Sequence, residues 1–551
     1  MLTLDNLNIY FISNIFEKEC NLTEPHYGTK YCKEKINITE EEINSYKNKH
    51  IFDYPPVNDL IPKNFDILPP PEKINKYPEK IKSHKNIEVW HLQDTIFKIP
   101  KVYAIAQFIT PEDLCNFSEI KNRILSTLFD ALITIELSEF IYMTQLTGVD
   151  FDHSFHIDKS HISFIGYNDS LKKCLKHFFE LIKNLNINNE RCKEIIELEQ
   201  KDFLRRTKNI FLIESFQLYL KYESGLLFQP SKEPKETINF FKENKITIED
   251  LIKYKNALFK NSKIKWLIQG NISKEEALEI AEEVNKIFEI DIEQEKIGKF
   301  FSSKPVVITK NYNYIYKWKS SNPNETNSSL VSIYQTDLLN TKEIQYFKLI
   351  ESFLANKFFD QLRTKETLGY IVQLTSSHNY GYYNLENIIQ SNSKTPEYCA
   401  SRVRNFYKES YKKIKDITEE EFKKHLNARI NVINKKDKNL FENFSLNWIV
   451  INDDTYEFDI IEKTLKSLNE CNREEFIKFY EKYFINEVAI LDSELLYDAH
   501  YEQNKKDLKE TKILEGENIK KRIICDNIED FKACNQLGVN FNNPIFKENN
   551  N

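Results

Sequence analysis

One order of elements occurs twice along this chain, and it constrains the possible folds more than any other feature. From about residue 91, two strand-like segments lead into a long helical run that stops before Gly148, and a hairpin, further helices and the strand Ile264–Gln269 follow. The same order returns from the strand Leu330–Thr336, through a long helix that ends near Gly369, and finishes in the strand Glu487–Leu491. A duplication of this period predicts two homologous α+β domains. A glycine after each long helix is typical of a left-handed C-cap, which we expect at Gly148 and at Gly369.

The segments outside the duplication differ in composition. Seven of the 16 prolines lie between residues 55 and 78, and proline-rich chain runs extended because it lacks backbone donors. The few elements before it are too small to make a domain alone. We therefore expect residues 1–50 to be the C-terminal remnant of an upstream domain, 51–86 a linker, 87–295 and 303–536 the two α+β domains, and 537–551 a loose tail.

Composition excludes several classes of protein. Lys and Arg number 77 against 84 Asp and Glu, a net charge of −7, which argues against a nucleic-acid partner. No apolar run approaches the 18 residues typical of a membrane-spanning helix, so we expect no membrane partner. The nine cysteines include no CxxC pair, which favours a reducing compartment and, with it, a cytoplasmic location.

Sequence signatures of catalysis are mostly missing. The chain contains no GxSxG, GxxxxGK[ST], GxGxxG or HExxH pattern. The closest approach to an HxxEH zinc motif is His177 with Glu180, where Leu181 replaces the second histidine, and one imidazole with one carboxylate cannot hold zinc. His153 and His156 would point to opposite faces of a strand. We therefore predict no catalytic residue and no metal ligand in this chain.

One segment carries side chains suited to a binding site. LRTKETLGYIV, residues 362–372, brings an arginine at a helix end, a sharp turn at Gly369, and Tyr370 at the start of a strand. Arg363 offers a planar fork of donors and Tyr370 a phenol, and both could face a peptide carbonyl or the oxyanion that forms on attack. The alternative is structural: Arg363 caps its helix and Tyr370 packs at a sheet edge.

This segment also resembles the C-terminal half of the insulinase (pitrilysin) family of inverzincin zinc metallopeptidases. The blocks YQTD before it and IIQS after it fit the same family. Four further blocks fall in the family's order and at similar spacing, so the resemblance runs from about residue 5 to about residue 535. They are Tyr27–Thr29 (YGT), Ile61–Pro69 (IPKNFDILP), Gly166–Asp169 (GYND) and Gly270–Ser273 (GNIS).

The resemblance implies a particular architecture. Family members have four similar α/β-sandwich domains in two halves that close around a peptide. This chain would then contain the end of the second domain, the linker, a third-type domain over 87–295 and a fourth-type domain over 303–536. The zinc-binding HxxEH motif belongs to the N-terminal half, and the positions matching Arg363 and Tyr370 contact substrate beside the scissile bond.

The sequence thus predicts the non-catalytic C-terminal half of a zinc metalloendopeptidase. Alone it should be inactive and should hold no zinc; in the complete enzyme its partners would be peptide substrates and an N-terminal catalytic half, encoded upstream or on a separate chain. Met1 corresponds to mid-domain in the family, which favours a truncated or split product. The alternative is a peptidase-inactive scaffold or peptide-binding subunit of the same superfamily.

Overall fold

The computed structural model describes residues 8–35, 38–47, 57–84, 87–111, 114–229, 234–289, 304–319, 322, 324–379, 381–496, 519–525 and 528–537. The chain divides into two compact units, Met1–Asp59 and Leu60–Asn551. Apart from residue 537, the expected tail over 537–551 lies outside the described residues.

The first unit contains little regular structure. A short hairpin pairs β1 (Leu22–Thr23) with β2 (Lys30–Tyr31), after one turn of 3-10 helix at Asn14–Phe16. Helix α1 (Glu40–Lys47) follows, and Thr39 starts it by exchanging hydrogen bonds with Glu42. A hydroxyl at this position satisfies an otherwise unpaired amide of the first helical turn.

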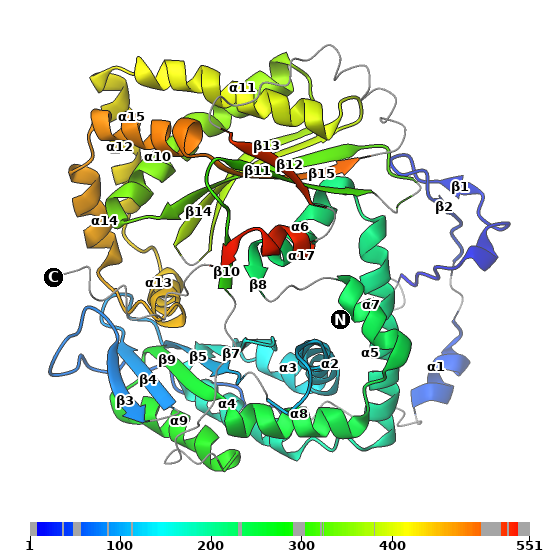
Figure 1. The fold of residues 1–551 in the computed structure, drawn as a ribbon. Helices are drawn as coiled ribbons and strands as arrows, with labels where there is room; N and C mark the ends of the chain where they lie inside the picture. Colours follow the sequence, from blue (N-terminus) through cyan, green and yellow to red (C-terminus); the bar gives the residue numbers. More distant parts are fainter. Residues whose placement is uncertain are drawn as a thin grey trace. The chain divides into compact units, whose positions relative to one another are not determined.

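The second unit is built on two six-stranded sheets (Figure 1). The first has the order β3-β4-β9-β5-β7-β6, in which β4 and β9 are parallel and the other neighbours antiparallel. Its strands are β3 (Glu79–His84), β4 (Ile87–Gln93), β5 (Lys101–Ile109), β6 (Asp150–Ser154), β7 (Lys159–Tyr167) and β9 (Lys263–Gly270). The edge strand β3 falls within the segment expected to be linker, because the chain pairs with β4 as soon as the prolines end.

The second sheet repeats this order as β16-β11-β15-β12-β14-β13. Its strands are β11 (Tyr312–Lys319), β12 (Ser328–Leu338), β13 (Ile371–Asn379), β14 (Tyr382–Ser391), β15 (Ala489–Leu496) and β16 (Lys521–Cys525). The parallel pair β11 with β15 matches β4 with β9, but the edge strands differ, because β16 is parallel to β11 whereas β3 is antiparallel to β4. A third, small sheet joins β8 (Phe228–Gln229), β10 (Lys304–Val307) and β17 (Gln536–Leu537).

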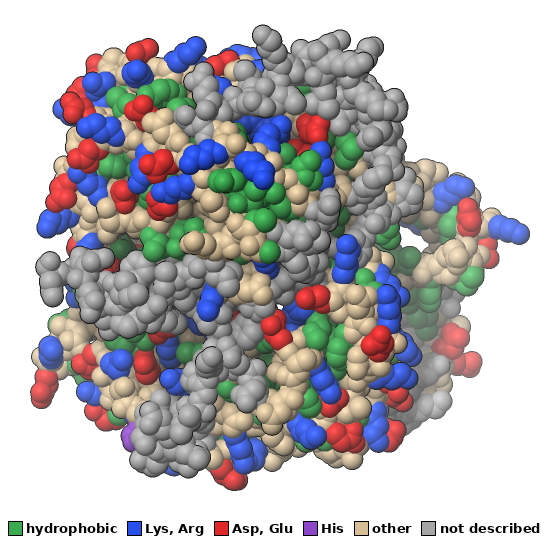
Figure 2. Space-filling model, in the orientation of Figure 1, with side chains coloured by type: hydrophobic (Ala, Val, Ile, Leu, Met, Phe, Trp, Pro, Cys, Tyr) green, Lys and Arg blue, Asp and Glu red, His purple; other side chains and the backbone are tan. Residues whose placement is uncertain are grey.

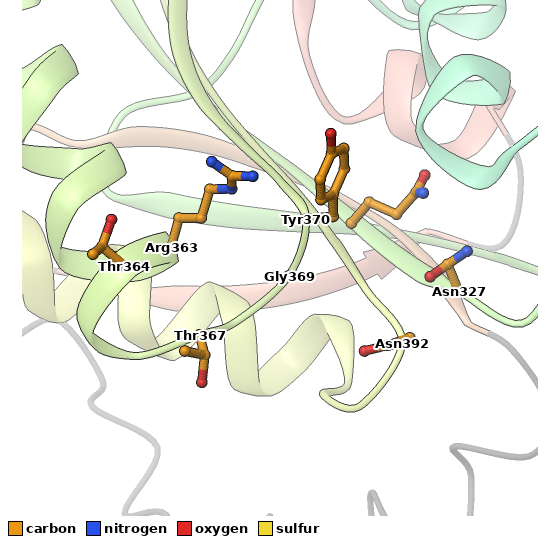
Figure 3. Close-up of a pocket in the computed structure, with 8 residues that line it drawn as sticks. Asn327, Arg363, Thr364, Thr367, Gly369, Tyr370 and Asn392 are labelled. Carbon is orange, nitrogen blue, oxygen red and sulfur yellow. The ribbon is translucent and has the colours of Figure 1, made fainter.

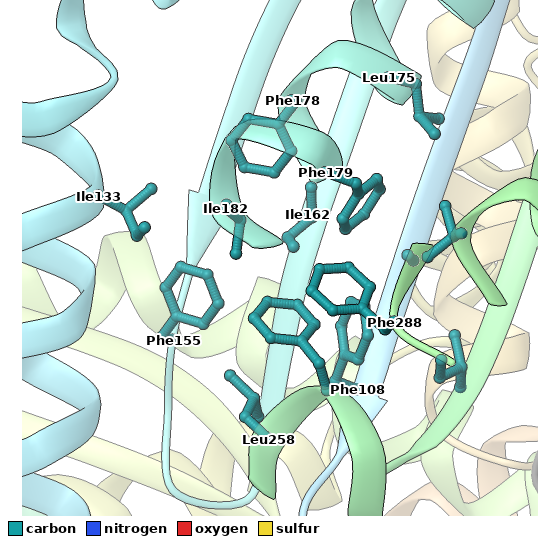
Figure 4. Close-up of a cluster of buried hydrophobic side chains, with 14 of the residues drawn as sticks. Phe108, Ile133, Phe155, Ile162, Leu175, Phe178, Phe179, Ile182, Leu258 and Phe288 are labelled. Atoms are coloured by element: carbon teal, nitrogen blue, oxygen red, sulfur yellow. The ribbon is translucent and has the colours of Figure 1, made fainter. Parts of the chain in front are cut away.

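Helices cover one face of each sheet and bury the two main cores. The first core contains a cluster of phenylalanine rings, drawn in Figure 4, with Phe108 from β5 and Phe178 and Phe179 from the helix over it. The helices of the first domain are α2 (Glu119–Glu136), α3 (Ser138–Gln145), α4 (Asn168–Asn184), α5 (Glu190–Asn209), α6 (Ser215–Leu227), α7 (Pro234–Glu243), α8 (Ile248–Asn261) and α9 (Lys274–Ile287). Those of the second are α10 (Thr341–Phe358), α11 (Pro396–Lys415), α12 (Glu419–Ile433), α13 (Leu440–Asn452), α14 (Ile460–Asn469), α15 (Arg473–Glu481) and α17 (Ile528–Ala533).

The second face of each sheet is covered by a helix from the other domain. Leu440, Phe444 and Ile451 of α13 pack on the first sheet against Trp90 and Tyr103. In return, α6 places buried leucines against the second sheet. The inner strands β4, β5 and β9 of the first sheet are accordingly buried along most of their length, as strands covered on both faces must be.

Candidate functional site

The candidate site is built at the C-terminal end of α10. Asn340 and Glu343 form a reciprocal capping box at the start of this helix. At its end the helix widens into a π-helical turn, Phe359–Lys365, and such turns are common at functional sites. The buried side chains of Leu362 and Leu368 anchor this turn in the second core.

The chain then makes a tight corner before entering β13. Thr367 has the left-handed conformation, with φ of 51°. Gly369 does not, but a Cβ placed on it would lie 1.9 Å from the carbonyl oxygen of Gln390. The expectation of a left-handed cap at Gly369 is therefore wrong. Glycine is needed there because the backbone approaches β14 too closely for any side chain.

An ion pair between Glu366 and Arg402 stabilises this corner. Glu366 accepts hydrogen bonds from Arg402 Nε at 2.7 Å and Nη2 at 2.8 Å, and a third from Gln361. Burial alone would raise the pKa of Glu366, but the hydrogen bonds from Arg402 and Gln361 outweigh it and lower that pKa. A two-pronged pair of this kind fixes geometry as well as charge.

Arg363 and Tyr370 lie next to each other on this frame. The guanidinium carbon of Arg363 lies 5.0 Å from the ring centre of Tyr370 and 4.8 Å from that of Phe359. Tyr370 is 83% exposed, so it does not pack at the sheet edge. Within the described part of the chain, Arg363 makes no ion pair or hydrogen bond that would neutralise or cap it. Its cation is thus positioned by two aromatic rings, with its donors left open to a ligand.

Both side chains line a pocket of about 450 Å³ (Figure 3). Figure 3 shows Arg363 and Tyr370 pointing toward the same side of the sheet. The lining residues are Asn327, Arg363, Thr364, Thr367, Gly369, Tyr370, Gln390 and Asn392. Arg363 carries the one formal charge in this lining; the rest are small, amide or hydroxyl side chains and the phenol. The arrangement suits a polar ligand that accepts hydrogen bonds, such as a peptide main chain.

Other parts of the sequence that could have carried chemistry are structural. His177 lies on the exposed face of α4, beside the ring of Phe140. His153 is bonded through Nδ1 to Asp130 at 3.0 Å, and His161 faces Gln107 at the interface with α13. In the described ranges, no three His, Cys, Asp or Glu side chains converge in a way that could hold a metal ion. The residues there do not fit a zinc site.

Sequence reasoning missed some residues at this site. Phe359 completes the stack on Arg363, and Asn327 and Asn392 line the pocket from outside the LRTKETLGYIV block. A single asparagine carries no motif, so only the fold identifies it. Phe359 could have been suspected, because four residues along a helix place two side chains on one face.

Figure 2 shows basic and acidic side chains interspersed over the face in view. None of the helices in the described ranges combines the length and the hydropathy that crossing a bilayer requires.

Comparison with known proteins identifies relatives over most of the chain. A family model described as the middle or third domain of peptidase M16 matches residues 1–240, and one described as domain 4 of the C-terminal lobe of PqqF-like PQQ synthase matches residues 349–448. Human insulin-degrading enzyme is 29% identical over 490 residues, which are 87% of this chain and 46% of that protein. The chain thus spans about half the length of such relatives.

Solved structures share the fold. The crystal structure of pitrilysin superposes with a TM-score of 0.76 at 18% identity, covering 95% of this chain and 53% of that one. A structure from Pseudomonas fluorescens, described as a peptidase M16 inactive domain, gives a TM-score of 0.56 at 12% identity and covers 76% of this chain and 97% of that one. The expected fold class, two homologous α/β-sandwich domains of the metallopeptidase type, is confirmed.

Proposed function

Because an M16 family model matches residues 1–240 and the chain aligns with about half the length of insulin-degrading enzyme, we propose that it belongs to the insulinase (M16) family and is the non-catalytic C-terminal half of a zinc metalloendopeptidase. In this role it forms one half of a chamber that encloses peptide substrates. Arg363 and Tyr370 contact the substrate beside the scissile bond.

One observation supports this role most directly: the half-buried Arg363, for which the described residues provide no ion-pair partner, is stacked on the exposed Tyr370 at the edge of a polar pocket. A guanidinium and a phenol can donate hydrogen bonds to a carbonyl oxygen that becomes negative on attack. The buried leucines of the π-helical turn and the Glu366–Arg402 pair keep both donors in place. Such preorganised donors stabilise a transition state more than a bound ground state.

The zinc of the complete enzyme belongs, in this proposal, to an N-terminal half carrying the HxxEH motif. The described residues here offer no fitting ligand set, so no step of hydrolysis is assigned to them. The N-terminal half is the expected partner, either upstream in the same polypeptide or as a separate chain. A cytoplasmic location is proposed because the nine cysteines include no CxxC pair, which favours a reducing compartment.

The test is reconstitution. The purified chain should not cleave a fluorogenic peptide, with or without zinc, whereas mixing it with an M16 N-terminal half should produce chelator-sensitive cleavage. In that assembly Tyr370→Phe and Arg363→Ala should lower kcat by about 10²–10³ and change KM little. Arg363→Lys should be nearly as impaired as Arg363→Ala, because lysine lacks the planar fork. Unchanged kcat in Tyr370→Phe, measured per folded molecule, would remove the proposed contact.

A second candidate is a peptidase-inactive scaffold or peptide-binding subunit. The similarity to the Pseudomonas fluorescens inactive domain favours it, because that chain is covered almost entirely by this fold. Under this role the chain binds peptides without ever gaining activity from an N-terminal half. Peptide binding measured by fluorescence anisotropy, combined with failed reconstitution, would select it.

A further inference from the structure

Two amide side chains of the candidate pocket have one end fixed by the protein and the other end free. Gln390, near the end of β14, and Asn327, directly before β12, line the pocket of Figure 3 together with Arg363 and Tyr370. A side-chain amide carries an acceptor on one side and donors on the other. The partner that fixes one side therefore decides what the other side presents to a ligand.

The oxygen of the Gln390 side chain is held by the start of helix α6. Ser215 Oγ donates to Gln390 Oε1 at 3.2 Å, and Phe216 N donates to it at 3.3 Å. Because a backbone N–H can only donate, the oxygen of this amide must face the helix. Gln390 is 8% exposed, so packing also restricts its rotation. Within the described chain, Gln390 Nε2 has no protein acceptor, which leaves its N–H donors for the pocket.

Asn327 is held in the opposite sense, through its nitrogen. Its Nδ2 donates to Glu325 Oε1 at 2.9 Å, and its backbone N donates to the same oxygen at 2.7 Å. An ionised carboxylate can only accept, so the amide oxygen must face away from it. The other oxygen of this buried carboxylate accepts from Ser215 N at 2.8 Å, so α6 fixes Glu325 as well. No group in the described ranges donates to Asn327 Oδ1, which leaves an acceptor for a ligand.

We propose that Gln390 and Asn327 determine specificity for the peptide main chain. Gln390 Nε2 donates to a backbone carbonyl of the substrate, and Asn327 Oδ1 accepts from a backbone N–H. The inference rests on the proposed function, because it concerns a substrate bound at the site of Arg363 and Tyr370.

The alternative ligand for a pocket with an arginine is an anion. A phosphate or carboxylate offers acceptors alone, whereas a peptide backbone carries an acceptor and a donor in each unit. Arg363 and Tyr370 could serve either ligand, but the Asn327 oxygen would repel an anion. The two oriented amides therefore favour a peptide main chain, whatever the side chains of the substrate.

The first experiment measures the binding of a fluorescein-labelled peptide with blocked termini to the full chain by fluorescence anisotropy. Companion peptides replace one backbone amide at a time by an ester, which removes a single N–H and keeps the side chains. In the wild type, one ester position should weaken binding about 3–10-fold, as expected for one neutral hydrogen bond. In Asn327→Ala the unmodified peptide should bind less tightly by the same factor, and that ester should have no further effect. Asn324→Ala, at an exposed position of the same loop, should keep the wild-type pattern.

The second experiment tests the donor with Gln390→Glu. Glutamate keeps an acceptor for Phe216 N and Ser215 Oγ but presents a charged oxygen, in place of an N–H, to the substrate carbonyl. Binding of the unmodified peptide should weaken at least about ten-fold. Gln373→Glu adds the same charge at an exposed position of β13 outside the pocket lining and should bind as tightly as the wild type. Thermal unfolding checks that both variants are folded, and the ester series with Asn327→Ala does not depend on either of them.

The outcomes separate this inference from the proposed function. If the wild type binds the peptide but every ester costs as much in Asn327→Ala as in the wild type, the role of Asn327 is overturned and the proposed function stands. Unchanged or tighter binding by Gln390→Glu overturns the role of Gln390 in the same way. Displacement of the peptide by inorganic phosphate would identify an anion site instead. A wild-type chain that binds no peptide overturns the proposed function, and this inference with it.

Discussion

The two domains of the second unit have the same strand order but different interiors and different corners. β9 and β15 occupy the same place in the duplicated sheets, each parallel to one neighbour. On β9 the side chains that face the domain's own helices are Ile264, Trp266 and Ile268, all in the apolar core. On β15 only Ile490 is apolar among the corresponding positions, and the buried Asp492 and Glu494 follow it.

A network of polar contacts stabilises the acidic residues that are buried on β15. Asp492, which is fully buried, accepts hydrogen bonds from Arg404 Nη1 at 2.9 Å, from Asn313 at 2.9 Å and from Ser332. Glu494 lies 3.7 Å from Lys317. A buried charge such as that of Asp492 costs several kcal/mol unless it is paired in this way. Burial instead raises the pKa of Glu494 and favours its neutral form. The same sheet position can therefore be filled by packing or by a polar network, and the two solutions should respond differently to pH and mutation.

The corners that lead into the two hairpins differ as well. In the first domain Gly148, with φ of +73°, caps the end of the helical run as expected. In the second domain, Thr367 takes the left-handed conformation and Gly369 lies against β14. Only the second corner carries the stacked Arg363 and Tyr370. The duplication thus repeats the frame, while the candidate site depends on features that one copy alone possesses.

The largest expected effect concerns Glu494 and pH. Burial, followed by the charge of Asp492, raises its pKa from 4.5 to about 8. Between pH 4.5 and 8 the folded state keeps a proton on Glu494 that the unfolded state releases. The contribution of Glu494 to the free energy of unfolding should therefore be fully present only below about pH 4.5. This stability should be lost as the pH rises to 8, by at most about 5 kcal/mol. Urea unfolding followed by circular dichroism at several pH values measures this loss.

The matched variants separate this carboxyl from the rest of the protein. Glu494→Gln should flatten the pH dependence between 4.5 and 8, whereas Glu279→Gln, on the exposed side of α9, should leave it as in the wild type. A pH profile of Glu494→Gln that still follows the wild type would show that Glu494 is ionised in the folded state.

The next effect concerns the Arg404–Asp492 pair. Arg404→Met removes the cation and leaves a carboxylate that is 0% exposed, which should cost about 3–5 kcal/mol of unfolding free energy. Arg404→Met combined with Asp492→Leu should recover most of this loss, because no unpaired charge remains. Urea unfolding of the single and double variants measures both. Equal destabilisation in the two would mean that packing, not charge, is what Arg404 contributes.

The two glycines should differ in the same experiment. Gly369→Ala brings a Cβ to 1.9 Å from a backbone oxygen and must displace β13 from β14, so we expect a loss of about 3 kcal/mol or more. Gly148→Ala meets only the ring of Tyr167 at 2.9 Å and should cost about 1–2 kcal/mol for its left-handed φ. The reverse order of unfolding midpoints would contradict the assignment of the close approach to Gly369.

The smallest effect concerns the ion pair behind the candidate site. Glu366→Gln removes the charge of a partly buried, two-pronged pair and should cost about 1–2 kcal/mol. Glu419→Gln breaks an exposed pair with Lys423 and should change stability by less than about 0.5 kcal/mol. Thermal unfolding of both variants measures the difference. Equal decreases in melting temperature would show that Glu366 does not support the corner that carries Arg363 and Tyr370.

Much of the fold follows from local patterns. The strand segments expected around Ile264–Gln269 and Glu487–Leu491 correspond to β9 and β15, and the hairpins after both glycines are present. Short-range rules suffice for these, because alternation, capping and helix breaks act within a few residues. The prediction at Gly369 failed because its reason is a contact with β14, some twenty residues further along the chain, which no local rule contains.

The sequence by itself determined the duplicated order of elements, the resemblance to a peptidase family, and Arg363 and Tyr370 as the residues to examine. Only the tertiary structure decided that α6 and α13 each cover the other domain's sheet, that Phe359 completes the stack on Arg363, and that charged residues occupy one core. The reason is that these features depend on which distant faces meet. Burial and pairing are set by neighbours in space, whereas composition and periodicity report only neighbours along the chain.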